Sequence, residues 1–381
     1  MLSEIMTDWG LYIHIPYCQS RCRYCAFYST TGVPEGAYID ALLAEAVQKK
    51  KEIGNGKVDT VYLGGGTPSR LPVSFLTRLL RGIFETFPIA DSAEITMEMN
   101  PSDMTEEYLS AARALGVNRL SVGVQSFDDR LLSAIGRRHT AREAKAAIKR
   151  AFHAGFKNIS IDLMYDLPGQ SAKDFEKSLL AAVHLPVTHM SIYSLILEEG
   201  TPFYRLAEAG KLPRPTENES WAMYGAMCRI LPHYGFARYE ISSFAKKGCE
   251  SRHNEKYWHL DNYLALGPAA AGRVGHVRTK NTPDIRAYMK AVLSGNLPPV
   301  EVESLTKEEE IEEYCFLHIR MKEGIGKREY VTRYGEPMEA RYAAVIEKLR
   351  REGLLSETED RIFMTKRGAA LGNIVFEAFL K

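Results

Sequence analysis

The first half of the chain alternates between short apolar segments and amphipathic helical segments, and this alternation is the strongest constraint on its fold. The predicted strands are residues 11–15, 58–63, 94–99, 119–124, 158–164 and 189–196, and the predicted helices are 38–51, 75–87, 106–115, 129–154 and 172–183. Apolar strands separated by helices are typical of a parallel sheet covered on both faces. Six such units predict an α/β fold. They suit a partial (βα)6 TIM-like barrel better than a doubly wound sheet, which periodicity alone does not exclude.

The second half of the chain loses this alternation beyond Thr201. Prolines mark a loop up to Pro215, and residues 221–233 are predicted as a helix. A second boundary is expected at residues 296–299, which read Asn-Leu-Pro-Pro. We therefore divide the chain into a barrel (1–235), a linking segment (236–298) and a small C-terminal domain (299–381).

The C-terminal domain is predicted to be a winged-helix-like α+β unit. Helices are expected over 307–321 and 338–352, and a short strand over 361–364. Such domains often bind DNA, but the first of these helices carries a cluster of glutamates: Glu308, Glu309, Glu310, Glu312 and Glu313. A solvated acidic face of this kind favours a structural or lid role over nucleic-acid binding.

Charge and cysteine content indicate a protein of a reducing compartment. The 381 residues carry a formal net charge of +1, so no strong attraction to nucleic acid is expected. The N-terminus lacks the basic start and apolar run of a secretory signal, and no apolar stretch reaches the roughly 18 residues that a spanning helix needs. Six cysteines are too few for a disulfide scaffold in a chain of this length. We therefore expect a cytoplasmic protein.

Three of the six cysteines, Cys18, Cys22 and Cys25, lie together directly after the first predicted strand. Thiolates at this spacing can ligate three irons of a 4Fe-4S cluster and leave the fourth iron open. Zinc is the alternative, but a structural zinc site needs four protein ligands. No fourth Cys or His lies nearby at the expected spacing, since His14 precedes the motif on the strand. The scattered Cys228, Cys249 and Cys315 are expected to be small buried hydrophobic residues.

Polar residues lie at the ends of three consecutive predicted strands. Glu98 lies at the end of the third strand, Gln125 at the end of the fourth, and Asp162 in the fifth. A polar side chain inside an apolar strand costs free energy unless it is paired. One such residue could be a satisfied core group, but three at equivalent strand ends converge on the face where barrel active sites lie. The run Gly64–Thr67 ends the second strand, and its glycines allow either a close approach to a ligand or a tight turn.

The cysteine motif, with Tyr12-Ile-His14-Ile-Pro16-Tyr17 before it, resembles the radical S-adenosylmethionine (SAM) superfamily. More narrowly, the chain is similar to the group that contains oxygen-independent coproporphyrinogen III oxidase and the heme chaperone HemW. The resemblance implies a barrel of the radical SAM type, a 4Fe-4S cluster, and SAM chelated to the open iron. It also implies an electron donor, since one electron from the cluster cleaves SAM to methionine and a 5′-deoxyadenosyl radical.

The same resemblance assigns the residues that contact SAM. In the family the glycine run contacts the methionyl part, an arginine faces the carboxylate, and polar strand-end residues bind the carboxylate, ribose or amino groups. One aromatic residue packs at the cluster, and the residue between the last two cysteines contacts the adenine side. The implied cofactor-binding residues are Tyr12, Tyr24, Gly65, Gly66, Thr67, Glu98, Gln125, Arg137 and Asp162.

Phe27 indicates the branch of this group. The oxidases carry a further cysteine two positions after the third, and here that position is Phe27, which is the pattern of the HemW branch. The chain also begins only a short segment before its first strand, without the longer N-terminal segment of the oxidases.

A second HemW-like signature, H-N-x-x-Y-W, occurs at residues 253–258. Histidine is a common axial ligand of heme iron, and aromatic rings pack on a porphyrin face, so the resemblance makes His253, Tyr257 and Trp258 candidate heme contacts. Core packing of the same side chains is the alternative. Ala271 stands where relatives usually carry a histidine, so no role of that residue is carried over to this chain.

Three functions remain open at this point, and whether the protein is an enzyme depends on which is right. The favoured one is a HemW-type heme chaperone, with heme, SAM, an electron donor and heme-acceptor proteins, membrane-associated ones included, as its partners. The second is an oxidase that decarboxylates coproporphyrinogen III in porphyrin biosynthesis. The third, a metal-stabilised interaction domain without SAM chemistry, leaves Glu98, Gln125 and Asp162 unexplained.

Overall fold

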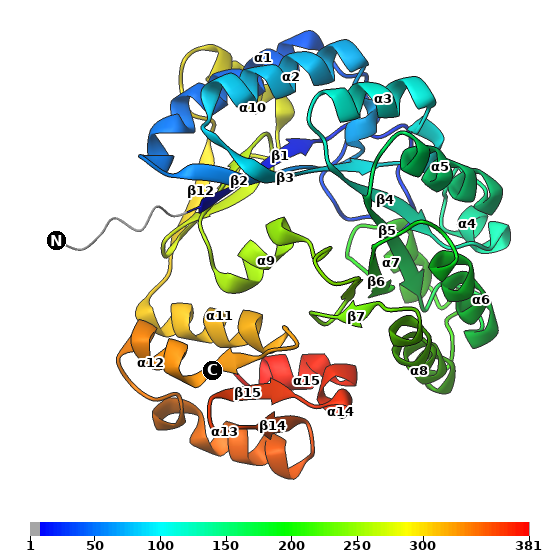
Figure 1. Cartoon of the computed structure of the whole chain (residues 1–381), viewed down its shortest axis with the longest axis vertical. Helices are drawn as coiled ribbons and strands as arrows, with labels where there is room; N and C mark the ends of the chain where they lie inside the picture. Colours follow the sequence, from blue (N-terminus) through cyan, green and yellow to red (C-terminus); the bar gives the residue numbers. More distant parts are fainter. Residues whose placement is uncertain (1–7, 381) are drawn as a thin grey trace.

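A computed structural model describes residues 8–380 of the chain. The core of the fold is one twelve-stranded sheet. Six central strands are parallel and follow one another in chain order: β1 (Asp8–Ile15), β2 (Lys57–Gly65), β3 (Ile89–Met99), β4 (Arg119–Gln125), β5 (Asn158–Tyr165) and β6 (His189–Ser194). The helices between them cover its outer face (Figure 1): α1 (Gly36–Lys49), α2 (Val73–Thr86), α3 (Glu106–Ala114), α4 (Asp129–Ala134), α5 (Ala141–His153) and α6 (Ala172–Val183). This arrangement confirms the predicted partial (βα)6 barrel, which stays open because the sheet has two free edges.

The helical segment expected over 129–154 is two helices, and the break between them positions a cofactor residue. Gly136, with φ +81°, ends α4, because glycine adopts this left-handed conformation without strain. Thr140 then starts α5 with a capping box to Glu143. The short loop between the two helices carries Arg137 toward the cysteine loop.

The segment 236–298, expected as a linking segment, supplies strands to both flanks of the sheet. β7 (Ala237–Arg238) and β8 (Ser243–Ala245) extend it beyond β6, whereas β9 (Tyr263–Leu266), β10 (Ala271–Val274), β11 (Val277–Asn281) and β12 (Val300–Ser304) extend it beyond β1. β12 lies past residue 299, so the large sheet continues to Ser304. This segment also contains the helices α9 (Arg252–His259) and α10 (Ile285–Leu293). The remaining elements before the C-terminal domain lie earlier in the chain: the helices α7 (Pro202–Glu208) and α8 (Glu217–His233), and the short 3-10 helices η1 (Lys50–Ile53), η2 (Pro68–Arg70) and η3 (Pro101–Asp103).

The C-terminal domain is a winged-helix-like α+β unit with its own hydrophobic core. A three-stranded antiparallel sheet of β13 (Ile325–Gly326), β15 (Arg361–Met364) and β14 (Leu355–Glu357) packs with α11 (Lys307–Ile319), α12 (Lys327–Tyr334), α13 (Glu339–Arg351), α14 (Lys366–Ala370) and α15 (Gly372–Glu377). The apolar face of α11 lies in this core, while Glu308 and Glu309 are exposed. Over residues 8–380, every helix is too short or too polar to cross a membrane.

Helix α9 lies between the barrel and the C-terminal domain (Figure 1) and contacts both. On the barrel side, the backbone N–H of His253 donates a hydrogen bond to Glu94 at 3.2 Å. On the other side, the guanidinium of Arg320 lies 3.8 Å from the centre of the Trp258 ring and pairs with the buried Glu240 at 3.4 Å. Cation–π contacts of this kind contribute about 1–2 kcal/mol when desolvated. The helix that carries the H-N-x-x-Y-W motif therefore connects the barrel to the C-terminal domain through contacts with both.

Candidate functional site

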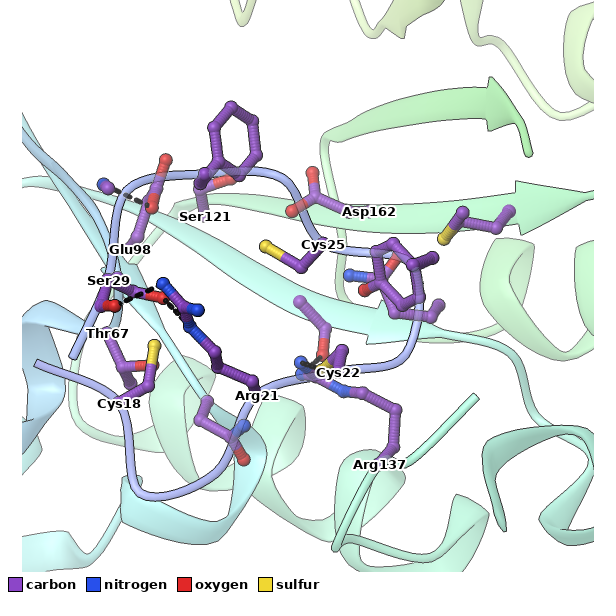
Figure 2. Close-up of a pocket in the computed structure, with 18 of the residues that line it drawn as sticks. Cys18, Arg21, Cys22, Cys25, Ser29, Thr67, Glu98, Ser121, Arg137 and Asp162 are labelled. Carbon is purple, nitrogen blue, oxygen red and sulfur yellow. Dashed lines mark hydrogen bonds between the residues drawn. The ribbon is translucent and has the colours of Figure 1, made fainter. Parts of the chain in front are cut away.

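The three clustered cysteines lie on one loop that curves around a cavity of about 420 Å³ at the carboxyl ends of the barrel strands (Figure 2). Backbone hydrogen bonds hold this loop at both ends: Cys18 N–H donates to Thr30 O at 2.8 Å, and Arg23 N–H donates to Ile135 O at 3.1 Å. Two sulfur atoms accept hydrogen bonds from residues predicted to contact SAM. Thr67 Oγ1 lies 3.5 Å from Cys18 Sγ, and Arg137 Nη1 lies 3.6 Å from Cys22 Sγ.

The donor set of this loop fits an iron–sulfur cluster better than a single ion. Within residues 8–380, no three His, Cys, Asp or Glu side chains converge closely enough to hold one metal ion. A 4Fe-4S cluster has no such requirement, because each thiolate ligates a different iron, whereas zinc needs a closed tetrahedral set. Burial raises the pKa of the Cys25 thiol, with Cys22 and Cys18 contributing, so its thiolate requires positive charge beside it. Cluster iron would supply that charge.

Two carboxylates face the cavity below the cysteine loop. Glu98 accepts hydrogen bonds from the Tyr62 hydroxyl at 2.9 Å and from the Gly65 N–H at 3.1 Å. Burial, reinforced by the neighbouring Asp162, raises the pKa of Glu98 to about 7. Burial also raises the pKa of Asp162 to about 6, against hydrogen bonds from Ser191 that lower it. A ligand that brings positive charge or hydrogen-bond donors stabilises the ionised form of these two carboxyl groups.

Gln125 and Arg137 meet next to Asp162, which pairs with Gly123 between β4 and β5. The β4–β5 pairing shifts register between Gly123 and Gln125, and Gln125 has φ +70°, a conformation that non-glycine residues rarely adopt. A Cβ on Gly123 would lie 3.0 Å from Arg137 Nη2 and 3.2 Å from Gln125 Nε2, so glycine makes room for both. Arg137 donates to Gly123 O and Cys22 Sγ, while its buried Nε finds no partner among the described residues. That donor suits an anionic group of a ligand.

The glycine run joins β2 to the start of the cysteine loop. Gly66 N–H donates to Ile15 O at 2.9 Å, and Thr67 N–H donates to Tyr17 O at 2.9 Å. Gly65 has φ +108°, and a Cβ there would lie 2.3 Å from the His14 ring. Packing against β1 therefore requires glycine at this position, whatever the run contacts in a ligand.

Replacing Gly65 by alanine is expected to destabilise the protein by about 2–4 kcal/mol, since it combines a strained φ with a clash against the His14 ring. Gly200→Ala is the matched control, because Gly200 has φ +81° and nothing within 4 Å of a Cβ. Denaturant unfolding of both variants measures the difference. Equal losses in the two would show that the contact with His14 contributes nothing.

The two aromatic residues assigned to SAM lie in different places. Tyr24 lines the cofactor cavity. Tyr12 lines a second cavity on the flank of the barrel, its hydroxyl lies 3.0 Å from His14 Nδ1, and its ring stacks on Tyr62 at 6.2 Å. Tyr12 is therefore not among the residues that line the cofactor cavity, and it contacts one of them, Tyr62, whose hydroxyl donates to Glu98.

The H-N-x-x-Y-W motif occupies three environments. His253 is fully buried, with Nδ1 2.9 Å from Thr60 Oγ1 and Nε2 2.8 Å from the Tyr257 hydroxyl, so both ring nitrogens are paired. Burial lowers the pKa of His253 to about 3, and its ring stacks on Tyr62 at 5.2 Å. Trp258 packs under Arg320. Among the three candidate heme contacts, Tyr257 lines the second cavity, whereas His253 and Trp258 line neither of these two cavities.

Several lining residues carry no recognisable motif and were not anticipated. They occupy alternate positions on the strands, so they point to the same face as the predicted residues; they are Tyr62, Arg119, Ser121, Ser191 and Tyr193. Asn254, the second residue of the H-N-x-x-Y-W motif on α9, also lines this cavity. Ser121 and Arg119 lie two and four residues before Gly123. The period-two alternation of a strand could therefore have identified both as lining residues from the sequence. Arg21, whose guanidinium donates to Ser29 O, completes the rim (Figure 2).

The chain is similar to known proteins along nearly its whole length. Residues 12–182 match the Radical SAM superfamily, and residues 305–371 match the HemN C-terminal domain. The chain is 38% identical to heme chaperone HemW of Bacillus subtilis over 97% of this chain and 98% of that protein. It is 34% identical to heme chaperone HemW of Mycobacterium tuberculosis (strain ATCC 25618 / H37Rv) over 98% and 95% of the two chains.

A solved structure shows the same fold. The coproporphyrinogen III oxidase HemN from Escherichia coli superposes with a TM-score of 0.85, at 22% identity over 98% of this chain and 90% of that one. Membership in the radical SAM superfamily implies a 4Fe-4S cluster and SAM, which the cysteine loop and the polar cavity fit. With relatives that align over nearly their full length, the chain belongs to the HemW family of radical SAM proteins.

Proposed function

We propose that this protein is a cytoplasmic heme chaperone, which binds heme and delivers it to acceptor proteins, and in which the cluster and SAM have a supporting role. The observation that carries the proposal is Phe27. Its ring is 71% exposed and lines the cofactor cavity at the position where the oxidases carry a further cysteine. The full-length similarity to proteins named heme chaperones agrees with this assignment.

In this proposal the cavity holds the cluster and SAM through the chain's own donors. Cys18, Cys22 and Cys25 ligate the cluster, and when bound it supplies one electron to SAM from an external donor. The guanidinium of Arg137, which lines the cavity, binds the SAM carboxylate, and Glu98 and Asp162 lie near the positive charge of SAM and its N–H and O–H donors. Gln125, Thr67 and the glycine run complete the contacts, while Tyr24 closes the cavity beside the last cysteine.

The test is anaerobic reconstitution of the cluster followed by two assays on the same sample. One assay adds SAM, a reductant and coproporphyrinogen III, and follows vinyl products. The other titrates heme and follows its absorption band. The proposal predicts stoichiometric heme binding without vinyl products. Turnover of coproporphyrinogen would overturn it in favour of the oxidase, and a sample that does neither would contradict both.

A variant of His253 separates a heme ligand from a packing residue. His253→Ala is expected to destabilise the protein by about 2–4 kcal/mol, because it leaves Thr60 Oγ1 and the Tyr257 hydroxyl without partners in the interior. The absorption spectrum of bound heme is expected to keep its band position, since neither ring nitrogen is free for iron. A shifted heme band in a variant of unchanged stability would reverse this assignment.

A further inference from the structure

A second cavity, of about 450 Å³, opens on the flank of the barrel next to the cysteine loop. It is built by β1, the residues after Cys25, α9 and the flanking strands β9 to β11. Its lining consists of Tyr12, His14, Ala26, Phe27, Tyr28, Tyr257, Tyr263, Ala269, Ala271, Lys280 and Pro283. Only Ala26 and Phe27 also line the cofactor cavity, so these two residues form the wall between the cavities.

The lining of the second cavity is aromatic. Five of its side chains are Tyr or Phe rings, and Tyr257 and Tyr263 meet edge to face at 4.7 Å. The hydroxyls of Tyr12 and Tyr257 are hydrogen-bonded to histidines behind them, so these two phenols are held in place by the protein. Phe27 leaves most of its ring in solvent, which costs free energy that a flat apolar ligand would recover. Such a surface suits a planar aromatic macrocycle.

The two cavities differ in the charges that line them. Lys280 is exposed at the rim of the second cavity, the lining of which contains no carboxylate. The cofactor cavity carries charges of both signs, because arginines line it together with Glu98 and Asp162. A ligand with an apolar ring and carboxylate arms fits the second cavity, where the aromatic side chains contact the ring and Lys280 pairs with a carboxylate.

We propose that heme binds in this second cavity, with its ring against Phe27, Tyr257 and Tyr263 and a propionate at Lys280, while SAM stays in the cofactor cavity. The assignment rests on the proposed heme-chaperone function and adds the site to it. Heme and SAM are then held at the same time, separated by Ala26 and Phe27, the residues that follow the last cluster cysteine. Glu301 lies opposite Lys280 in the β11–β12 pairing, and this carboxylate competes for the same ammonium group.

The first experiment is heme titration of the reconstituted full chain, with variants of the lining. Ala271→Trp fills the cavity and is expected to weaken heme binding by tenfold or more, whereas Ala209→Trp, on the exposed end of α7, leaves it unchanged. Lys280→Glu is expected to weaken binding roughly three- to tenfold, against no change for Lys290→Glu at the exposed end of α10. Circular dichroism and the cluster absorbance of each variant confirm that it is folded.

A gain-of-function variant reports the location directly. Ala271→His places an imidazole on the cavity wall, so bound heme is expected to shift its absorption band toward that of a histidine-ligated iron. Ala209→His is the control and leaves the spectrum unchanged. A spectrum that does not respond to Ala271→His, together with full affinity in Ala271→Trp, would place heme elsewhere.

Competition with SAM separates the two cavities in the native sequence. Saturating SAM is expected to change heme affinity less than twofold, and displacement of one ligand by the other would overturn the separate sites. If the wild-type chain binds no heme, the proposed function itself fails. If it binds heme with equal affinity in Ala271→Trp and Lys280→Glu, the function survives and only this site is refuted.

Discussion

Replacing Cys22 by serine is expected to abolish the iron–sulfur cluster. Cys22 is one of three ligands, and a serine hydroxyl is a far weaker acid and a poor iron ligand. The variant should lose the broad visible absorbance and the bound iron of the reconstituted protein. It should also lose SAM binding, because the open iron is then absent.

The control for this variant comes from the same chain. The prediction that Cys228 is buried is wrong: it is exposed on α8, outside the cysteine loop, and of the three scattered cysteines Cys315 is the buried one. Cys228→Ser should therefore retain full iron and absorbance. Iron and sulfide analysis of both variants after identical reconstitution gives the comparison. A Cys22→Ser protein with the iron content of wild type would show that these cysteines do not hold the cluster.

Replacing Glu98 by glutamine is expected to remove most of the pH dependence of SAM binding. The pKa of Glu98 is raised to about 7 and that of Asp162 to about 6, so both carboxyls are largely protonated at pH 5.5 and ionised at pH 8. The sulfonium of SAM is positively charged and favours the ionised pair. Affinity should therefore rise about tenfold over this range in wild type, which corresponds to roughly 1.4 kcal/mol, and rise by much less in Glu98→Gln, in which Asp162 alone still titrates.

The same carboxyl changes the stability of the SAM-free protein in the opposite direction. A pKa that folding raises from 4.5 to about 7 means that the folded state binds the proton more tightly than the unfolded state. The free energy of unfolding should therefore fall as pH rises from about 4.5 to 7, by about 2–3 kcal/mol. Glu98→Gln should remove this fall, whereas Glu208→Gln, at an exposed position of α7, should not. Parallel pH profiles in all three proteins would contradict the assigned pKa.

Much of this fold follows from sequence periodicity, because the elements concerned are buried in a regular way. Strands β1 to β6 are apolar, and their helices have a single buried face, so pattern and structure agree. The strands on the flanks gave no such signal. β12 is exposed along its whole length, and β10 and β11 are short and partly polar, so only pairing with their neighbours makes them strands.

Some residues of the candidate site could likewise be predicted from the local sequence, whereas the environment of others depends on tertiary packing. The cysteine spacing and the residues at the strand ends are local features, and they meet in one cavity as expected. The environment of the H-N-x-x-Y-W motif depends on how α9 docks, which the sequence does not state. Docking buries His253 between Thr60 and Tyr62 and leaves Tyr257 at a cavity. The histidine of the motif is therefore buried behind the cofactor cavity, with both ring nitrogens hydrogen-bonded.

Stacked rings connect the two cavities. Tyr257 is hydrogen-bonded to His253, the ring of which stacks on Tyr62, and the Tyr62 hydroxyl donates to Glu98. Tyr12 covers the other side of Tyr62. The side chains of Tyr257, His253 and Tyr62 thus form a packed layer between the second cavity and Glu98.

The electron paramagnetic resonance spectrum of the reduced cluster, recorded with and without SAM, tests the central claim most directly. A cluster on Cys18, Cys22 and Cys25 has one iron without a protein ligand, so SAM binding at that iron should shift the g values of the reduced signal. The shift should persist in Cys228→Ser and disappear when Arg137, Glu98 and Asp162 are replaced together by neutral residues. A signal that is identical with and without saturating SAM would contradict an open iron in the cofactor cavity.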